Sequence, residues 1–365
     1  GELPDGATVL GAGGHEERVS GLFSMLGEEP RKRATARAGD VVALGRLDTI
    51  RSGETITTNK HAIGQADLAQ PLAPVFGVGV GLKDRKDEVK LTTALGKLAE
   101  EDPSLTVEQN PDTHQMLLLG QGEMHMRVAL EKLERKFAVP VLRERRHVPY
   151  KETIRHKVEV RGRHKKQSGG HGQFGDVLVD IGPLPRGSGF VFNEVITGGA
   201  IPRQYIPSVE YGVKDYMAHG PLGFPVVDIE VTLKDGSFHT VDSSDMAFRQ
   251  AARIAMTDGM PKCSPVLLEP IMAVEIAVPA EATARINGMI PQRRGQILGF
   301  DAREGWPGWD VVLAHIPAAE MDDLIVELRS ATAGVGTFTA KFDHLAELTG
   351  KLADHVLAQH KPAAA

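Results

Sequence analysis

Cysteine is almost absent from this chain of 365 residues. Cys263 stands alone, so no internal disulfide can form, and a zinc site built on thiolates is excluded for lack of a second soft ligand. The isolated histidines His114, His125 and His315 lack a partner pattern of metal-site type, so we expect structural roles for them and no metal site. A single thiol is typical of a reducing compartment and predicts a cytoplasmic protein.

Long apolar runs are missing as well. No stretch reaches the roughly 20 residues needed to cross a bilayer, and the start, Gly1-Glu2-Leu3-Pro4, has neither an initiator Met nor a signal-peptide pattern. We therefore expect no membrane partner and a chain that is a fragment of a longer protein.

Hydrophobic residues at 41% and charged residues at 25% predict buried cores. The net charge of −6 gives no global sign of nucleic-acid binding, so any basic surface must be local.

The phosphate-binding motif G-x-x-x-x-G-K-[ST] does not occur in the sequence. Without its backbone amides and lysine, the chain alone is not expected to hydrolyse GTP, and we predict no catalytic residues and no cofactor. Gly11-Ala-Gly-Gly-His15 resembles a dinucleotide loop only in part, because G-x-G-x-x-G is incomplete and no β-α-β pattern surrounds it. It is interpreted as a β-turn.

The length exceeds what one hydrophobic core supports, and the pattern of the chain divides into four segments. Residues 1–66 have turn signals between short apolar runs, which predicts a small β-barrel truncated at its beginning. Residues 67–147 and 267–365 each repeat the order β-α-β-β-α-β, typical of a ferredoxin-like domain, the second with a C-terminal tail. Residues 148–266 alternate as strands and two helices. The expected fold class is α+β multidomain.

The expected elements follow from apolar periodicity. In the first β-α-β-β-α-β unit, strands are predicted at 75–80, 105–107, 115–119 and 140–142, with a helix at 84–101 and another before the last strand. In the second, they are 271–278, 296–300, 310–315 and 337–342, with helices at 281–291 and 320–332. The middle segment has strands at 157–160, 176–181 and 226–231 and helices at 207–219 and 244–257. Asp242, Ser243 or Ser244 can cap the last helix.

The most informative stretch for function is residues 161–175, where four Lys or Arg side chains and two histidines meet a glycine-rich bend. Cations neutralise phosphates, glycines permit close approach, and amide or hydroxyl groups reach sugars and base edges, so the mixture suits RNA. The alternative is a solvated hairpin whose charges serve solubility. The candidate RNA-binding residues are Arg163, Lys165, Lys166, Gln167, Ser168, Gly169, Gly170, His171, Gly172 and Gln173.

A second candidate lies at residues 235–244, where Asp235-Gly236 signals a turn and His239 follows it. An exposed histidine can hydrogen-bond to RNA or stack on it. A hydrolase triad of His239, Asp242 and Ser243 or Ser244 is disfavoured, because no G-x-S-x-G elbow is present; helix capping by the serines is preferred.

Arg293 and Arg294 form a weaker candidate in the last segment. Paired guanidiniums can reach phosphate, and a surface salt bridge is an equally good interpretation.

Taken together, these motifs resemble elongation factor G, in order and over essentially the whole chain. The resemblance rests on Lys97-Leu-Ala-Glu-Glu-Asp-Pro103, Gly120-Gln-Gly-Glu-Met-His125, Gln167-Ser-Gly-Gly-His-Gly-Gln-Phe-Gly175, Gly198-Gly-Ala-Ile-Pro202, Gly223-Phe-Pro-Val-Val-Asp228, Val241-Asp-Ser-Ser244, Leu268-Glu-Pro-Ile-Met272 and residues 288–295 and 320–332. It implies part of a domain II barrel, a ferredoxin-like domain III, a ribosomal protein S5-like domain IV and a ferredoxin-like domain V. The GTPase domain, with its GTP and Mg, is expected to precede Gly1.

The resemblance also implies a function in translation by binding rather than by covalent chemistry. The tip of domain IV, matching residues 168–173 and His239, is expected to enter the decoding region and contact tRNA and mRNA during GTP-driven translocation. Domain V would face the large subunit, with Arg293 and Arg294 near ribosomal RNA, so the partner is the ribosome and the protein a monomer. Alternatives are a ribosomal protection or recycling factor of the same architecture, a phosphate-binding enzyme on the S5-like module with His239 as acid or base, and a protein-binding scaffold.

Three positions depart from the family pattern. His171 stands where Arg is frequent, Asp176 where a neutral or basic residue is frequent, and residues 333–336 lack a usual arginine. All three reduce positive charge. We therefore expect a divergent paralogue, with ordinary translocation in doubt.

Overall fold

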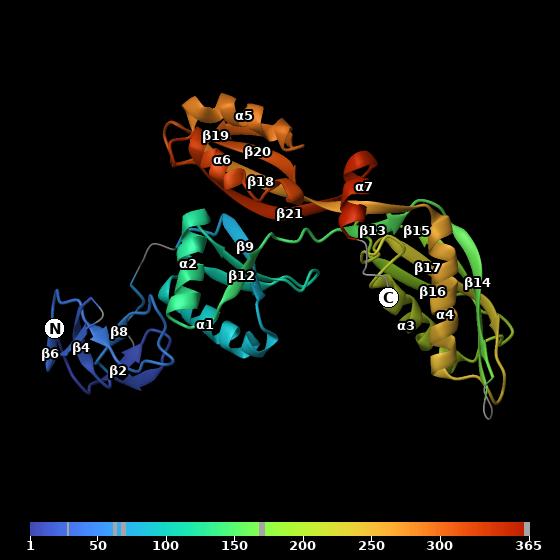
Figure 1. The fold of residues 1–365 in the computed structure, drawn as a ribbon, viewed down its shortest axis with the longest axis horizontal. Coiled ribbons are helices and arrows are strands. Elements are labelled where there is room, and N and C mark those ends of the chain that lie inside the picture. The colour runs from blue at the N-terminus through green and yellow to red at the C-terminus, as the bar shows by residue number, and fades with distance from the viewer. Residues whose placement is uncertain (28, 61–63, 67–70, 168–171, 361–365) are drawn as a thin grey trace. The chain divides into compact units, whose positions relative to one another are not determined.

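The computed structural model describes residues 1–27, 29–60, 64–66, 71–167 and 172–360 (Figure 1). It divides into two compact units, one of residues 1–110 with 114–145 and one of residues 111–113 with 146–365. Each unit is described by itself. None of the described helices is both long and apolar enough to cross a bilayer.

Short antiparallel strands make up the first 60 residues of the first unit. β1 (Glu2–Pro4) pairs with β6 (Thr35–Arg37), while β2 (Thr8–Gly11) lies between β3 (Glu16–Arg18) and β8 (Ile56–Thr57). β4 (Leu22–Leu26) lies between β5 (Glu29–Lys32) and β7 (Ala43–Leu44). Val9, Val19 and Leu22 are buried and form their core. The predicted β structure of this segment is confirmed.

A ferredoxin-like module completes the first unit. Its elements are β9 (Phe76–Leu82), α1 (Glu88–Glu101), β10 (Thr106–Gln109), β11 (Met116–Gly120), α2 (Glu123–Arg135) and β12 (Val141–Glu144), with a 3-10 helix at Arg85–Asp87. The antiparallel sheet has the order β10-β11-β9-β12. Leu95 and Leu98 of α1 and Met126 and Leu133 of α2 are fully buried, so one stripe of each helix forms the core.

The second unit contains another module of the same topology. Its elements are β18 (Pro265–Pro279), α5 (Thr283–Gln292), β19 (Gln296–Ala302), β20 (Trp309–Pro317), α6 (Leu324–Ala331) and β21 (Thr337–Leu348). The sheet order is β19-β20-β18-β21. α5 and α6 cover one face of this sheet (Figure 1), where Val274 and Ile276 are buried, while Glu275 of the other face is exposed. Both predicted ferredoxin-like modules are therefore confirmed.

β18 is longer than predicted. It begins at Pro265, and its first residues pair with β13 (Lys151–Ile154) of the preceding segment. The predicted boundary between residues 266 and 267 therefore falls inside a strand.

The middle module has β14 (Val158–Lys166), β15 (Gln173–Pro183), β16 (Phe190–Glu194), α3 (Ile206–Met217), β17 (Ile229–Ser237) and α4 (Asp245–Gly259). The sheet order is β14-β15-β17-β16, and β16 runs parallel to β17. The apolar face of α4 includes Phe248, Ala251 and Ala255, all fully buried. This arrangement fits the predicted S5-like domain.

Glycine sets how closely α4 approaches the β14–β15 ribbon. A Cβ added at Gly162 would lie 2.2 Å from the carbonyl oxygen of Ala251, and one at Gly175 would lie 2.6 Å from that of Ala247. Both positions must lack a side chain, since the helix backbone fills that space. The ribbon and α4 therefore run side by side (Figure 1).

The C-terminal residues, predicted from the sequence to be only a tail, form a further helix. α7 (Gly350–Gln359) buries Ala353 in a small cluster with Phe224, Leu267 and Leu348. The ring of His360 stacks on Phe224 with centroids 4.1 Å apart.

Candidate nucleic-acid interface

The end of the β14–β15 ribbon presents two free cations. Lys165 and Lys166 are exposed at the last two positions of β14, opposite Phe174 and Gln173 of β15. No ion pair reaches either ammonium group from the part of the chain that the structure describes. Gln167 is exposed beside them. Such groups can reach a phosphate without first breaking an internal contact.

The two arginines of the same stretch are arranged differently. Arg161 and Arg163 converge on Asp176, whose side chain is fully buried. Arg161 donates from Nε and Nη2 at 2.8 and 2.6 Å, and Arg163 donates from Nη2 at 3.1 Å. Ser237 donates a further hydrogen bond at 2.8 Å. The expected four cations therefore become two exposed lysines and two arginines that share one carboxylate, which offsets one of their two charges.

The electrostatics of Asp176 follow from these contacts. Burial alone would raise the pKa of its carboxyl, but the hydrogen bonds from Arg161, Arg163 and Ser237 outweigh burial and lower it to about 2. Asp176 is thus an anion at neutral pH. About half of each guanidinium side chain remains exposed, and RNA contact by Arg163 stays a prediction.

The loop after β17 is fixed against the end of the ribbon that carries Lys165 and Lys166. The backbone N–H of Phe174 donates to the carbonyl of Asp242 (2.8 Å), and that of Gly172 donates to Oδ1 of Asp242 (2.9 Å). The hydroxyl of Ser243 donates to the carbonyl of Phe174 at 2.8 Å. The two predicted candidate segments, far apart in sequence, therefore lie side by side.

His239 is exposed on this loop. The N–H groups of Val241 and Asp242 donate to its Nδ1 at 3.3 and 3.2 Å, which assigns the proton to Nε2. Oδ2 of Asp242 also lies 3.3 Å from Nδ1, an ion pair only if the ring is protonated. With Nδ1 occupied by the two amides, Nε2–H is the available donor of this ring.

The serines of this loop have structural roles. Ser244 caps α4, because its Oγ accepts from the N–H of Ala247 at 3.2 Å. The Oγ of Ser243 accepts from the N–H of His239 at 2.9 Å while it donates to Phe174. The predicted cap is confirmed, with Ser244 as the residue that provides it. Neither hydroxyl is presented to His239 as a nucleophile would be.

The remaining tip residues divide into two groups. Gln173 is exposed, and its Oε1 lies 2.9 Å from Nε2 of His164, while Gly172 is half-buried. Ser168, Gly169, Gly170 and His171 lie outside the described residues, and their RNA contacts stay predictions.

The weaker candidates, Arg293 and Arg294, form ion pairs within their own module. Arg294 makes a bidentate pair with Glu269 at 2.7 and 2.9 Å and a third contact with Glu320 at 2.8 Å. Arg293 pairs with Glu327 at 2.7 Å and donates to the backbone oxygen of Glu320. The salt-bridge interpretation is what the structure shows. Their contact with ribosomal RNA stays a prediction without support from this geometry.

Asp176 is the residue whose role the sequence analysis missed. It was noted only as a departure from a family pattern, yet it organises the arginines of the ribbon. A cross-strand signal was available: Arg161 and Arg163, two residues apart, lie on one face of a strand. A carboxylate on the next strand is their natural partner.

Three family models match consecutive parts of the chain. They are elongation factor G domain III at residues 72–144, domain IV at residues 146–264 and the elongation factor G C-terminus at residues 266–356. Together they account for both ferredoxin-like modules and the module between them. The chain belongs to the elongation factor G family.

Individual relatives agree with this assignment. An elongation factor G-like protein of Synechocystis sp. (strain ATCC 27184 / PCC 6803 / Kazusa) is 54% identical over 340 residues, which are 93% of this chain and 50% of that protein. A crystal structure from Thermus thermophilus aligns with a TM-score of 0.83 at 36% identity, over 99% of this chain and 54% of that one. The chain thus spans about half the length of these relatives.

Proposed function

We propose that this chain is the ribosome-binding region of an elongation factor G-like translation factor, and that the end of the β14–β15 ribbon contacts RNA. The observation that carries the proposal is the pair of exposed lysines, Lys165 and Lys166, next to a loop that offers the Nε2–H of His239. In the intact protein, a GTPase domain outside this chain would hold GTP and Mg. GTP hydrolysis by that domain would drive translocation of tRNA and mRNA through the ribosome. The factor would act in the cytoplasm as a monomer.

The physical mechanism is occupation of a site by a preorganised ribbon. Asp176 holds Arg161 and Arg163 in place, and Asp242 and Ser243 attach the neighbouring loop to the ribbon. The lysines therefore project from a fixed frame, and less conformational entropy is lost on binding than for a loose tail. Contacts of this kind provide affinity and register rather than sequence recognition.

The test is the salt dependence of ribosome binding. Lys165→Ala with Lys166→Ala should flatten the slope of log affinity against log salt by roughly 1.4 to 1.8, since each phosphate contact contributes about 0.7 to 0.9. Binding of the chain to bacterial ribosomes can be measured by filter binding over a salt series.

The matched control is Lys262→Ala with Lys351→Ala, which removes the same charge from exposed positions of the same unit. It should leave the slope unchanged. Equal slopes for wild type and the Lys165/Lys166 double variant would refute RNA contact at the ribbon end. Equal effects of both double variants would show that only net charge matters.

A further inference from the structure

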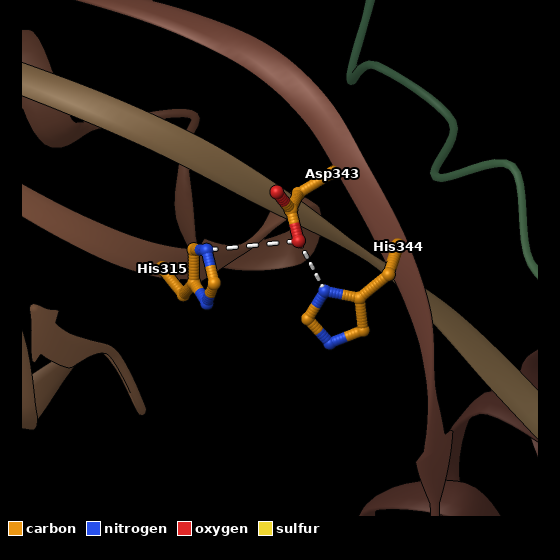
Figure 2. A group of neighbouring side chains, drawn as sticks. All are labelled: His315, Asp343 and His344. Atoms are coloured by element: carbon orange, nitrogen blue, oxygen red, sulfur yellow. Dashed lines mark hydrogen bonds and ion pairs between the residues drawn. The ribbon is translucent and has the colours of Figure 1, made fainter.

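A cluster of two histidines and a carboxylate lies on the C-terminal ferredoxin-like module. His315 comes from β20, and Asp343 and His344 come from β21 (Figure 2). The three side chains point toward one another, with Asp343 between the two rings. The sequence predicts only a structural role for His315, and neither the proposed ribosome contact nor the family assignment uses this cluster.

A β-bulge brings the three residues to one face of the sheet. Ile271 of β18 pairs with His344, but the next residue, Met272, pairs with Phe342, so Asp343 is an extra residue in β21. His315 pairs with Ala273, two residues along β18 from Ile271 and on the same face. In a regular strand Asp343 and His344 would point to opposite faces; the bulge lets both point toward His315.

The spacing of the ligand atoms is close to that of a metal site. Nδ1–H of His344 donates to Oδ2 of Asp343 at 2.6 Å, and Nε2 of His315 lies 3.6 Å from the same oxygen. All three candidate ligand atoms lie within 4.8 Å of one another. Around a tetrahedral zinc ion with bonds of about 2.0 to 2.1 Å, ligand atoms are about 3.3 Å apart. Side-chain rotations that move these atoms by about 1 Å would therefore suffice, together with a change of the His344 tautomer that moves its proton from Nδ1 to Nε2 and leaves the Nδ1 lone pair for the metal.

The electrostatic state suits a cation as well. Asp343 provides a carboxylate that lies against both imidazole rings, with Oδ2 at 2.6 Å from Nδ1 of His344 and at 3.6 Å from Nε2 of His315. Lys341, on the same strand, pairs in register with Ala273 and is the nearest positive charge along that row. Its side chain is exposed and free to turn toward solvent.

We propose that His315, Asp343 and His344 form a binding site for a divalent transition-metal ion such as Zn²⁺. Imidazole nitrogens and one carboxylate oxygen are ligands that suit zinc, nickel and copper rather than magnesium or calcium. Because Asp343 and His344 are about half exposed and His315 is a quarter exposed, at least one coordination position stays with water. The ion would join β20 and β21 across the central strand β18.

The direct test is zinc titration of the untagged full chain, freed of metal by chelator and followed by isothermal calorimetry. Wild type should bind one equivalent of Zn²⁺ through this cluster. His315→Ala, Asp343→Asn and His344→Ala should each weaken that binding by more than about tenfold, because even outer-shell changes cost about 10- to 100-fold. His355→Ala is the matched control, since His355 is an exposed histidine on α7 of the same unit.

Two further measurements distinguish a specific site from loose binding. Co²⁺ should give visible absorption bands of imidazole ligation in wild type and in His355→Ala, and lose them in the cluster variants. Affinity should also fall from neutral to mildly acidic pH, because protons compete for the imidazoles. The proposal is overturned if wild type binds no zinc, or if the three cluster variants bind it as tightly as His355→Ala. Neither result depends on ribosome binding, so the two proposals fail separately.

Discussion

Glu152 of β13 should make the second unit less stable as the pH rises through neutrality. Its side chain is fully buried; Oε2 accepts from the N–H of Leu222 at 2.7 Å, and Oε1 has no hydrogen-bond partner among the described residues. Gly220 is packed against Oε1 so closely that an added Cβ would overlap it. Burial raises the pKa of this carboxyl from 4.5 to about 8, opposed only by the Leu222 amide.

The magnitude follows from proton linkage. Because the folded-state pKa lies above the unfolded value, the stabilisation is fully present below pH 4.5 and is lost as the pH rises toward about 8. Over that window the folded chain holds one more proton than the unfolded chain, so the free energy of unfolding falls by about 1.4 kcal/mol per pH unit. Between about pH 5.5 and about pH 7.5 the loss is on the order of 3 kcal/mol.

The substitution Glu152→Gln removes the ionisation and keeps the shape and the hydrogen bond from Leu222. Native-state hydrogen exchange of the β13 amides, read by mass spectrometry, reports the stability of this module without assuming that the whole chain unfolds at once. The difference between variant and wild type at each pH cancels intrinsic exchange chemistry and all other titrating groups. Glu281→Gln, which removes a charge from an exposed site, is the matched control.

The expected result is a variant whose advantage over wild type grows steadily from about pH 5.5 to about pH 7.5. The control should show no such trend. A constant difference between Glu152→Gln and wild type across the range would refute the argument, because it would mean that the buried carboxyl is ionised throughout or solvated when the unit is folded.

Substitutions at three further positions test the frame of the middle module. Asp176→Asn should lower the free energy of unfolding by about 3 kcal/mol, because it leaves two guanidiniums facing a neutral group; an unchanged urea midpoint would show that the arginines are simply solvated. Gly162→Ala should cost at least about 2 kcal/mol by forcing a methyl into the backbone of α4, and an unaltered melting temperature would contradict the close approach. Ser244→Ala should cost about 1 kcal/mol through loss of the cap, while Ser244→Asp, which preserves an acceptor, should restore stability in the same thermal melts.

Most of the fold could be predicted from the sequence, because a segment with a strong apolar period is compatible with only one type of secondary structure. The apolar stripe of α4 and the alternation in β15 were visible without coordinates, and the repeated β-α-β-β-α-β order defined two modules. The apolar period predicted a strand only at 271–278, and a proline at position 270 is unusual for the middle of a central strand. The strand nevertheless passes through Pro270, and its pairing with β13 was hidden for that reason.

The candidate site was predicted as a set of residues and not as an arrangement. Composition marked the lysines and arginines of the ribbon as equivalent, because it does not show the register that places Asp176 of the next strand beside Arg161 and Arg163. The same limit applies to His315. Its partners lie 28 and 29 residues further along the chain and reach it through a bulge, an irregularity that no periodic pattern signals.

The shared strand β18 has a practical bearing on how this protein can be divided. Residues 265–268 are the hydrogen-bonding neighbours of all four residues of β13. A fragment that stops at residue 266 would lose the strand partners of Lys151 and Glu152, which are Leu268 and Leu267. That half of β13 would then have an unpaired edge. A fragment of the second unit that contains β13 should therefore extend through Leu268. Residues 265–268 are the first residues of β18 and also the pairing partners of β13.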